Sequence, residues 1–349
     1  MKTWLFNIWM ILAGSMTIVS CTNDDVPIAQ EESKVPVRLT LSFSDTPLTR
    51  DVDSKEETLD YTTTEQNYIA NAFLLLVNGN NEIVEVVSEL LVDQENPDAI
   101  VLSGLISNYQ EASKIVVMTN IKNQGIATDV ASWLKGFTDI NALYAAAIFL
   151  NTDVNGWNIS TRSIPMWGTT AMPTTVVNGS VNASVSLYRA LGKVNIWINE
   201  KQGFEGFRID SIKLRNSLDR GFCVSGKVPN ANVNVQYANV GSEVPATAQV
   251  RNDIVYNCQA ETKAYSDKIY VPEQLNDDAS KALCMDVYYT YNDVSKSKTL
   301  NFADYEWDII RNHSYIFNIS SVTQTTIECK LYYVVENWDE VTINIPEFN

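Results

Sequence analysis

Apolar and polar residues alternate in short runs along most of the chain, and this period of two predicts β-strands. The clearest run spans residues 35–43 and reads VPVRLTLSF. Pro36 near its start favours an edge position in a sheet, because proline has no backbone N–H to give to a neighbouring strand. One face of the run is polar. The other predicts a buried row made of Val35, Val37, Leu39, Leu41 and Phe43.

Short apolar runs separated by glycine, asparagine and proline fill most of the remaining sequence, as is typical of β-sandwiches. Residues 78–81, Asn-Gly-Asn-Asn, separate two such runs and predict a hairpin. Residues 129–151 instead predict one helical region, because their apolar residues have helical spacing. We therefore predict an all-β protein of two β-sandwich domains with one helical insertion in the N-terminal domain. The length of 349 residues supports two domains, and the boundary is expected near residues 191–199.

Residues 1–20 have the features of a targeting segment, with Lys2 before an apolar run that is too short for a comfortable membrane span. The run ends in Ile-Val-Ser-Cys, with Cys21 followed by polar residues. This ending resembles a bacterial lipobox, which implies cleavage before Cys21 and acylation of its sulfur. Acyl chains would anchor the protein to a membrane without spanning it. The alternative is an ordinary secretory signal with an incidental cysteine.

The net charge and the remaining cysteines narrow the classes of function. A formal net charge of -17 argues against nucleic-acid binding, which uses basic surfaces. With no CxxC pair and a single histidine, the chain offers no zinc pattern. Two interpretations of the cysteines stay open: two disulfides in an exported protein, or buried thiols that act as small hydrophobes. These cysteines are Cys223, Cys258, Cys284 and Cys329.

No catalytic or metal-binding motif stands out. His313 is the only histidine, and its place at the entrance to a strand predicts a surface or turn residue. Residues 151–156, NTDVNG, match the opening of an EF-hand loop, but Arg162 stands where the twelfth-position carboxylate belongs. We therefore predict no catalytic residue, no metal and no cofactor. The tryptophans beyond the targeting segment are scattered and are interpreted as core anchors: Trp133, Trp157, Trp167, Trp197, Trp307 and Trp338.

Five strand-borne phrases together resemble the fimbrillin family, the shaft and accessory subunits of type V pili. The resemblance implies transthyretin-like sandwiches, export as an outer-membrane lipoprotein, and a place in a cell-surface fimbrium that supports adhesion. It also implies donor-strand exchange, in which a pilin loses its first strand and the carboxy-terminal segment of another subunit fills the gap. The phrases are SIPMWGTT (163–170), VSLYRALGKVNIWI (185–198), KIYVPEQ (268–274), RNHSYIFNI (311–319) and NWDEVTINIP (337–346).

The polar, acidic segment 44–66 contains one arginine, Arg50. Taken alone, an isolated arginine there is an ordinary surface charge. In fimbrillins an arginine-specific protease cuts the loop after the first strand, so the resemblance implies cleavage between Arg50 and Asp51. A loop without alternating apolar residues gives a protease access. Arg38 lies inside the strand pattern and is expected to be protected.

A donor strand must repeat the alternation of the strand that it replaces. Only a short alternating stretch precedes Pro346, which favours an anchor or tip subunit over a shaft subunit. The candidate donor residues are Leu331, Tyr333, Val335, Val341, Ile343 and Ile345. We divide the chain into a lipoprotein signal peptide (1–20), a tether with the removable first strand (21–50), an N-terminal β-sandwich (51–192) and a C-terminal β-sandwich that ends in the donor (193–349).

Other interpretations stay open at this point. The first strand and the carboxy-terminal segment could each pair within its own sandwich, as the strands of β-proteins generally do. A monomeric surface lipoprotein that binds glycans through a sandwich face is one rival, and a glycoside hydrolase with two opposed carboxylates is another. The expected partners are other pilin subunits, an arginine-specific protease and the outer membrane through the lipid anchor.

Overall fold

The computed structural model describes residues 34–43, 67–96, 100–177, 179–198, 206–225, 243–258, 264–305, 308–322 and 327–335. Strands dominate these residues, so the predicted all-β class is confirmed. Within them, no helix is long and apolar enough to cross a bilayer.

One mixed sheet forms the first part of the fold, with strand order β3-β2-β6-β8-β9-β1-β5-β4. The join between β8 and β9 is narrow, with only Met166–Arg189 and Trp167–Tyr188 paired. Next to this join, a Cβ on Gly168 would lie 2.3 Å from the carbonyl oxygen of Ser186, so the close approach requires glycine. The strands are β1 (Val35–Phe43), β2 (Ala72–Val77), β3 (Ile83–Val87), β4 (Leu91–Asp93), β5 (Ile100–Ile106), β6 (Lys114–Thr119), β8 (Met166–Ala171) and β9 (Val181–Arg189).

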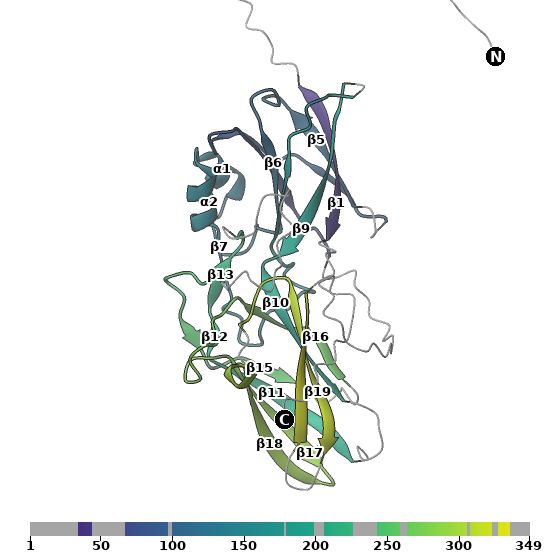
Figure 1. The fold of residues 1–349 in the computed structure, drawn as a ribbon, viewed down its shortest axis with the longest axis vertical. Coiled ribbons are helices and arrows are strands. Elements are labelled where there is room, and N and C mark those ends of the chain that lie inside the picture. Colours follow the sequence, from purple (N-terminus) through teal and green to yellow (C-terminus); the bar gives the residue numbers. More distant parts are fainter. Residues whose placement is uncertain are drawn as a thin grey trace, which may run out of the picture. The chain divides into compact units, whose positions relative to one another are not determined.

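The narrow join divides this sheet into two half-sheets, β3-β2-β6-β8 and β9-β1-β5-β4, that enclose a common core. Inward side chains of β1, β5 and β9 meet those of β2 and β6 in one buried cluster. A second cluster covers the opposite face of β2 and β6, where two short helices pack (Figure 1). This part of the fold therefore has three layers: helices, one half-sheet and the other half-sheet.

The predicted helical region is confirmed in place but differs in detail. It forms two helices, α1 (Val130–Lys135) and α2 (Ile140–Ala146), and each begins at an aspartate cap. Asp129 accepts a hydrogen bond from the backbone N–H of Ser132 at 3.1 Å, and this cap fixes the start of α1. The final residues of the predicted region form a strand instead, β7 (Ile148–Leu150), because they pair with β13 (Arg220–Phe222).

The predicted hairpin between β2 and β3 is present. Asn81 has a φ of 66°, and the side-chain oxygen of Asn78 accepts the backbone N–H groups of Asn80 and Glu82, both at 2.9 Å. An asparagine therefore supplies the left-handed residue that the turn requires.

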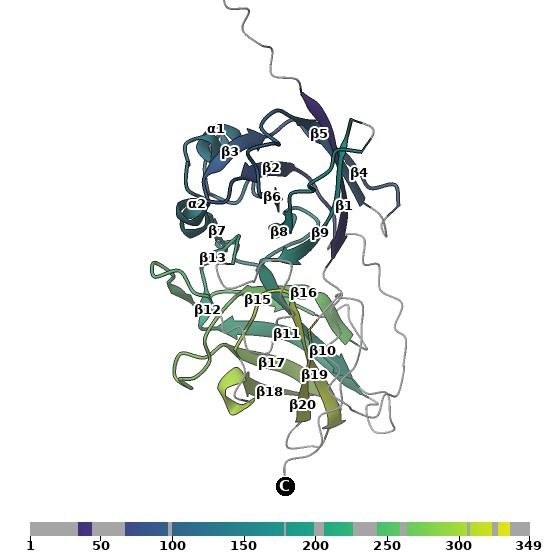
Figure 2. The same ribbon diagram turned by 45° about the horizontal axis from the view of Figure 1, so that its top comes forward.

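The edge position predicted for the first strand is wrong. β1 lies between β5, to which it is antiparallel, and β9, to which it is parallel (Figure 2). Pro36 is tolerated because the parallel ladder with β9 begins one residue later, at Val37.

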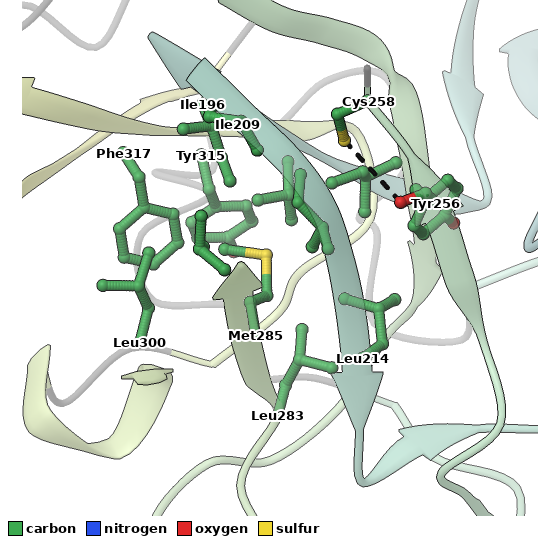
Figure 3. Close-up of a cluster of buried hydrophobic side chains, with 14 of the residues drawn as sticks. Ile196, Ile209, Leu214, Tyr256, Cys258, Leu283, Met285, Leu300, Tyr315 and Phe317 are labelled. Atoms are coloured by element: carbon green, nitrogen blue, oxygen red, sulfur yellow. Dashed lines mark hydrogen bonds between the residues drawn. The ribbon is translucent and has the colours of Figure 1, made fainter. Parts of the chain in front are cut away.

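The second part of the fold is a sandwich of two four-stranded sheets, β16-β10-β19-β20 and β15-β11-β17-β18 (Figure 2). Figure 3 shows its core, in which Tyr315 and Phe317 lie near Met285 and Leu300. The elements are β10 (Leu191–Ile198), β11 (Phe207–Arg215), β12 (Ser217–Leu218), β14 (Val250–Arg251), β15 (Val255–Asn257), β16 (Ala264–Pro272), β17 (Cys284–Tyr291), β18 (Val294–Asn301), η2 (Phe302–Tyr305), β19 (His313–Val322) and β20 (Ile327–Val335).

The two parts of the fold share contacts. β7 pairs with β13, and Leu191, Cys223 and Tyr270 belong to the core cluster beneath the helices. The assignment of residues 51–192 and 193–349 to separate domains stays a prediction.

Candidate functional site: the groove filled by the first strand

The first strand fills an apolar groove between β5 and β9, which we call the first-strand groove. Val37, Leu39 and Leu41 are 2%, 0% and 1% exposed, and Phe43 is 8% exposed. Val35, at the open end, is half-buried. The buried row predicted from the alternation is therefore present, and only its first member keeps substantial contact with water.

The groove is lined by paired residues on both sides of β1. On the β5 side, Val35, Leu39 and Leu41 lie opposite Ile106, Leu102 and Ile100. On the β9 side, each inward residue from Val37 to Phe43 also has an apolar partner. These β9 partners are Val181, Ala183, Val185 and Leu187.

Loss of β1 would expose both backbone and apolar surface. β5 and β9 would each gain an unpaired edge, which readily recruits another strand. Each fully buried aliphatic side chain contributes about 1.5–3 kcal/mol, so an empty groove would favour any strand with the same alternation. This geometry can support strand replacement.

The outward face of β1 makes few polar contacts. Arg38 and Thr40 are exposed, the hydroxyls of Ser42 and Ser186 are 3.3 Å apart, and Ser180 donates to the carbonyl oxygen of Pro36 at 3.2 Å. The strand is therefore held mainly by its backbone ladders and its inward row.

A buried arginine closes the far end of the groove. Arg189, the last residue of β9, is 1% exposed, and its guanidinium carbon lies 5.0 Å from the centroid of the Phe43 ring. Arg189 donates to the side-chain oxygen of Asn312 at 3.0 Å and to that of Asn67. One guanidinium therefore contacts Phe43 at the end of β1, Asn67 after the segment 44–66, and Asn312 in the turn before β19.

Several predicted site residues lie outside the described residues. They are Cys21, Arg50, Asp51, Val341, Ile343 and Ile345. The other donor candidates are on β20, where Leu331, Tyr333 and Val335 pair with Phe317, Tyr315 and His313 of β19. β20 is an outer strand of its four-stranded sheet. Their role as donors is a prediction.

The surface or turn position predicted for His313 is wrong. His313 is 1% exposed, and its Nδ1 donates to the carbonyl oxygen of Arg311 at 2.8 Å. The side chain is covered because the preceding turn packs on β10, where the N–H of Asn312 donates to the carbonyl oxygen of Leu191 at 2.9 Å. Burial lowers the pKa of His313 to about 4.

This low pKa predicts a pH-dependent stability. Because the pKa falls from 6.5 in the unfolded chain to about 4 in the fold, stability is complete above pH 6.5 and declines as the pH falls towards 4. We expect His313 to contribute a loss of about 2 kcal/mol between pH 7.5 and pH 5. Urea unfolding of the wild type and of His313→Asn at both pH values measures it. Identical losses in the two proteins would show that His313 is not the cause.

The EF-hand-like segment is held by arginines. Nη1 of Arg251 lies 2.6 Å from the carbonyl oxygen of Asn151 and 3.2 Å from that of Asp153. Nη1 of Arg162 lies 3.5 Å from the Asp153 carboxylate. Guanidinium groups therefore contact the oxygen atoms that a calcium ion would need as ligands. Among the described residues, no cluster of three or more histidine, cysteine or acidic side chains could hold a metal.

Three of the four cysteines beyond Cys21 are free thiols. Cys223, Cys258 and Cys284 are buried and form no disulfide. Burial raises the pKa of Cys223 to about 12, which keeps it protonated and unreactive. These three residues therefore act as small hydrophobes.

Two tryptophans confirm the interpretation as core anchors. Trp157 and Trp167 are 1% and 3% exposed, and both belong to the cluster beneath the helices.

Known proteins were compared with the chain in sequence and in structure. No protein-family model and no curated protein matches its sequence. In structure it is similar to a fimbrial assembly protein from Parabacteroides distasonis ATCC 8503, with a TM-score of 0.51 and 13% identity over 87% of this chain and 99% of that chain. A candidate cell adhesion protein from the same strain gives a TM-score of 0.50 and 13% identity over 89% and 99%. The chain shares their fold. The fold expected from the fimbrillin resemblance is thereby confirmed.

Sequence reasoning missed Arg189 and the buried pair of Arg311 with Glu273. A signal for Arg189 was present, because it is an arginine inside the apolar phrase VSLYRALGKV. A charged residue inside such a run is a candidate for a buried contact.

Proposed function

We propose that the protein is a non-enzymatic structural subunit of a cell-surface fimbrium that supports adhesion. In this proposal it is exported as a lipoprotein, acylated at Cys21 and anchored to the outer membrane. An arginine-specific protease then cuts between Arg50 and Asp51, β1 leaves, and the carboxy-terminal segment of another pilin subunit takes its place.

The observation that carries the proposal is the position of β1. It is a central strand with a fully apolar inward row, yet it is joined to the remaining sandwich only through the polar segment 44–66. A single cut in that segment would separate β1 covalently from the chain that forms the groove. The empty groove would then require an alternating strand.

Cleavage at Arg50 is expected to convert the folded monomer into polymers. An arginine-specific protease should cut the wild type after Arg50 and leave Arg38 intact, because β1 is paired along both of its edges. Size-exclusion chromatography and intact mass measure both steps. Arg50→Lys keeps the charge but removes the cleavage site, so it should stay monomeric. If Arg50→Lys polymerised as readily as the wild type after protease treatment, cleavage at Arg50 would not be the trigger of polymerisation.

A further inference from the structure

Arg189 gives the first-strand groove a chemically distinct end. Along the groove, Val37, Leu39 and Leu41 occupy apolar positions, whereas Phe43 lies against a guanidinium. If β1 leaves, the Phe43 ring leaves with it, and Arg189 then faces whichever side chain takes that position.

We propose that Arg189 determines the partner and the register of strand exchange by binding Glu347 from the carboxy-terminal segment of a second copy of this chain. The inference rests on the proposed function, because it requires that β1 be replaced. Because the donor is a second copy of the chain, it also requires a shaft-like subunit, in place of the anchor or tip role that the short alternating stretch before Pro346 favours. The donor enters in the direction of β1 and repeats its parallel ladder with β9.

Side-chain size supports this register at three positions. In the donor sequence VTINIPEFN, Val341 takes the place of Val37, and Ile343 and Ile345 take the places of Leu39 and Leu41. The first pair is identical. The other two exchange isomeric side chains of equal volume, which cores tolerate well.

Charge complementarity supports the same register at the fourth inward position, that of Phe43. The next inward residue of the donor is Glu347, which replaces Phe43 and brings a carboxylate to Arg189. A charge-assisted hydrogen bond in a buried setting is stronger than one between neutral groups. Pro346 takes the place of Ser42, which lies beyond the last pair with β5 at Leu41 but still pairs with Ser186 of β9 near the end of that ladder. A proline there costs at most one ladder hydrogen bond at the end of the groove.

The neighbouring registers are disfavoured because each buries a carboxylate among apolar side chains. A shift of two residues in one direction places Asp339 at the position of Val37, which is 2% exposed. The opposite shift places Glu347 at the position of Leu41, which is 1% exposed. An unpaired buried carboxylate is strongly unfavourable. In the proposed register Asp339 instead lies at the position of Val35, which is half-buried and open to water.

The test compares full-length chains after cleavage at Arg50. Labelled subunits are exchanged out of preformed polymers, and their dissociation rates are measured for the wild type, Glu347→Gln and the matched control Asp339→Asn. We expect Glu347→Gln to dissociate about tenfold or more faster, since the loss of a charged hydrogen bond has an effect of this size. Asp339→Asn should stay within about twofold of the wild type, because its position reaches water.

A double-mutant cycle assigns the effect to Arg189. In an Arg189→Met background, Glu347→Gln should cause no further acceleration. If Arg189→Met does not fold, the comparison of the wild type with Glu347→Gln and Asp339→Asn decides alone. Equal dissociation rates for the wild type and Glu347→Gln would overturn the inference and leave strand exchange intact. A cleaved wild type that forms no polymer would instead overturn the proposed function itself.

Discussion

Replacing Leu39 by alanine is expected to destabilise the uncut protein by about 2–5 kcal/mol and to leave the assembled polymer unchanged. Leu39 is 0% exposed in the core between the two half-sheets, so its truncation leaves a cavity there. In the polymer β1 has been lost, so the substituted residue is no longer part of the structure. Chemical unfolding of the uncut protein and of the purified polymer measures the two effects.

Leu102→Ala is the matched control. Leu102 is 1% exposed, lies directly opposite Leu39 and belongs to β5, which remains after cleavage. This substitution should destabilise the uncut protein and the polymer alike. If Leu39→Ala weakened the polymer as much as Leu102→Ala, β1 would still be in place and strand exchange would be wrong.

Replacing Glu273 by alanine is expected to cost about 3–5 kcal/mol of unfolding free energy, because it leaves Arg311 buried without its carboxylate. Both side chains are 3% exposed. Nε and Nη2 of Arg311 donate to the Glu273 carboxylate at 2.9 and 2.5 Å, and Nη2 also donates to the carbonyl oxygen of Phe222 at 3.2 Å. Burial raises the pKa of Glu273, and Arg311 opposes that rise. Urea unfolding at neutral pH measures the loss.

Two further variants separate burial from charge. Lys281→Ala breaks an exposed pair with Asp278, where the lysine side chain is 77% exposed, and should change stability by less than about 1 kcal/mol. The double substitution Glu273→Leu with Arg311→Met removes both charges and should be far less harmful than Glu273→Ala alone. A loss from Glu273→Ala no larger than that from Lys281→Ala would contradict the structural role of the buried pair.

Local alternation was enough to predict the strand that defines the groove. The inward row from Val35 to Phe43 follows from the period of two, since a strand presents every second side chain to one face. The two helices were predicted as one because spacing alone does not reveal the aspartate at position 139 as a second cap.

The sequence could not reveal which segments meet. β1 pairs with β9, which begins at Val181, and nothing local to Pro36 indicates a neighbour so far along the chain. The burial of His313 and the contact of Arg189 with Phe43 depend in the same way on tertiary packing. The features that sequence reasoning missed therefore depend on contacts between residues that lie far apart in the sequence.

The most direct test of strand exchange is to lock β1 in place reversibly. Arg38 on β1 lies opposite Ser103 on β5, and both belong to the outward face. Opposed residues of antiparallel strands have Cα atoms about 4.5–5.5 Å apart, a distance that a disulfide can span. Arg38→Cys combined with Ser103→Cys should therefore crosslink β1 to its neighbour when oxidised. Arg38→Cys alone is the control.

After cleavage at Arg50, polymer formation is followed by light scattering with and without reductant. Our account predicts that the oxidised double variant stays monomeric and that reductant restores polymerisation to the rate of the control. Polymerisation of the oxidised, crosslinked protein at the rate of the reduced protein would contradict the exchange of β1.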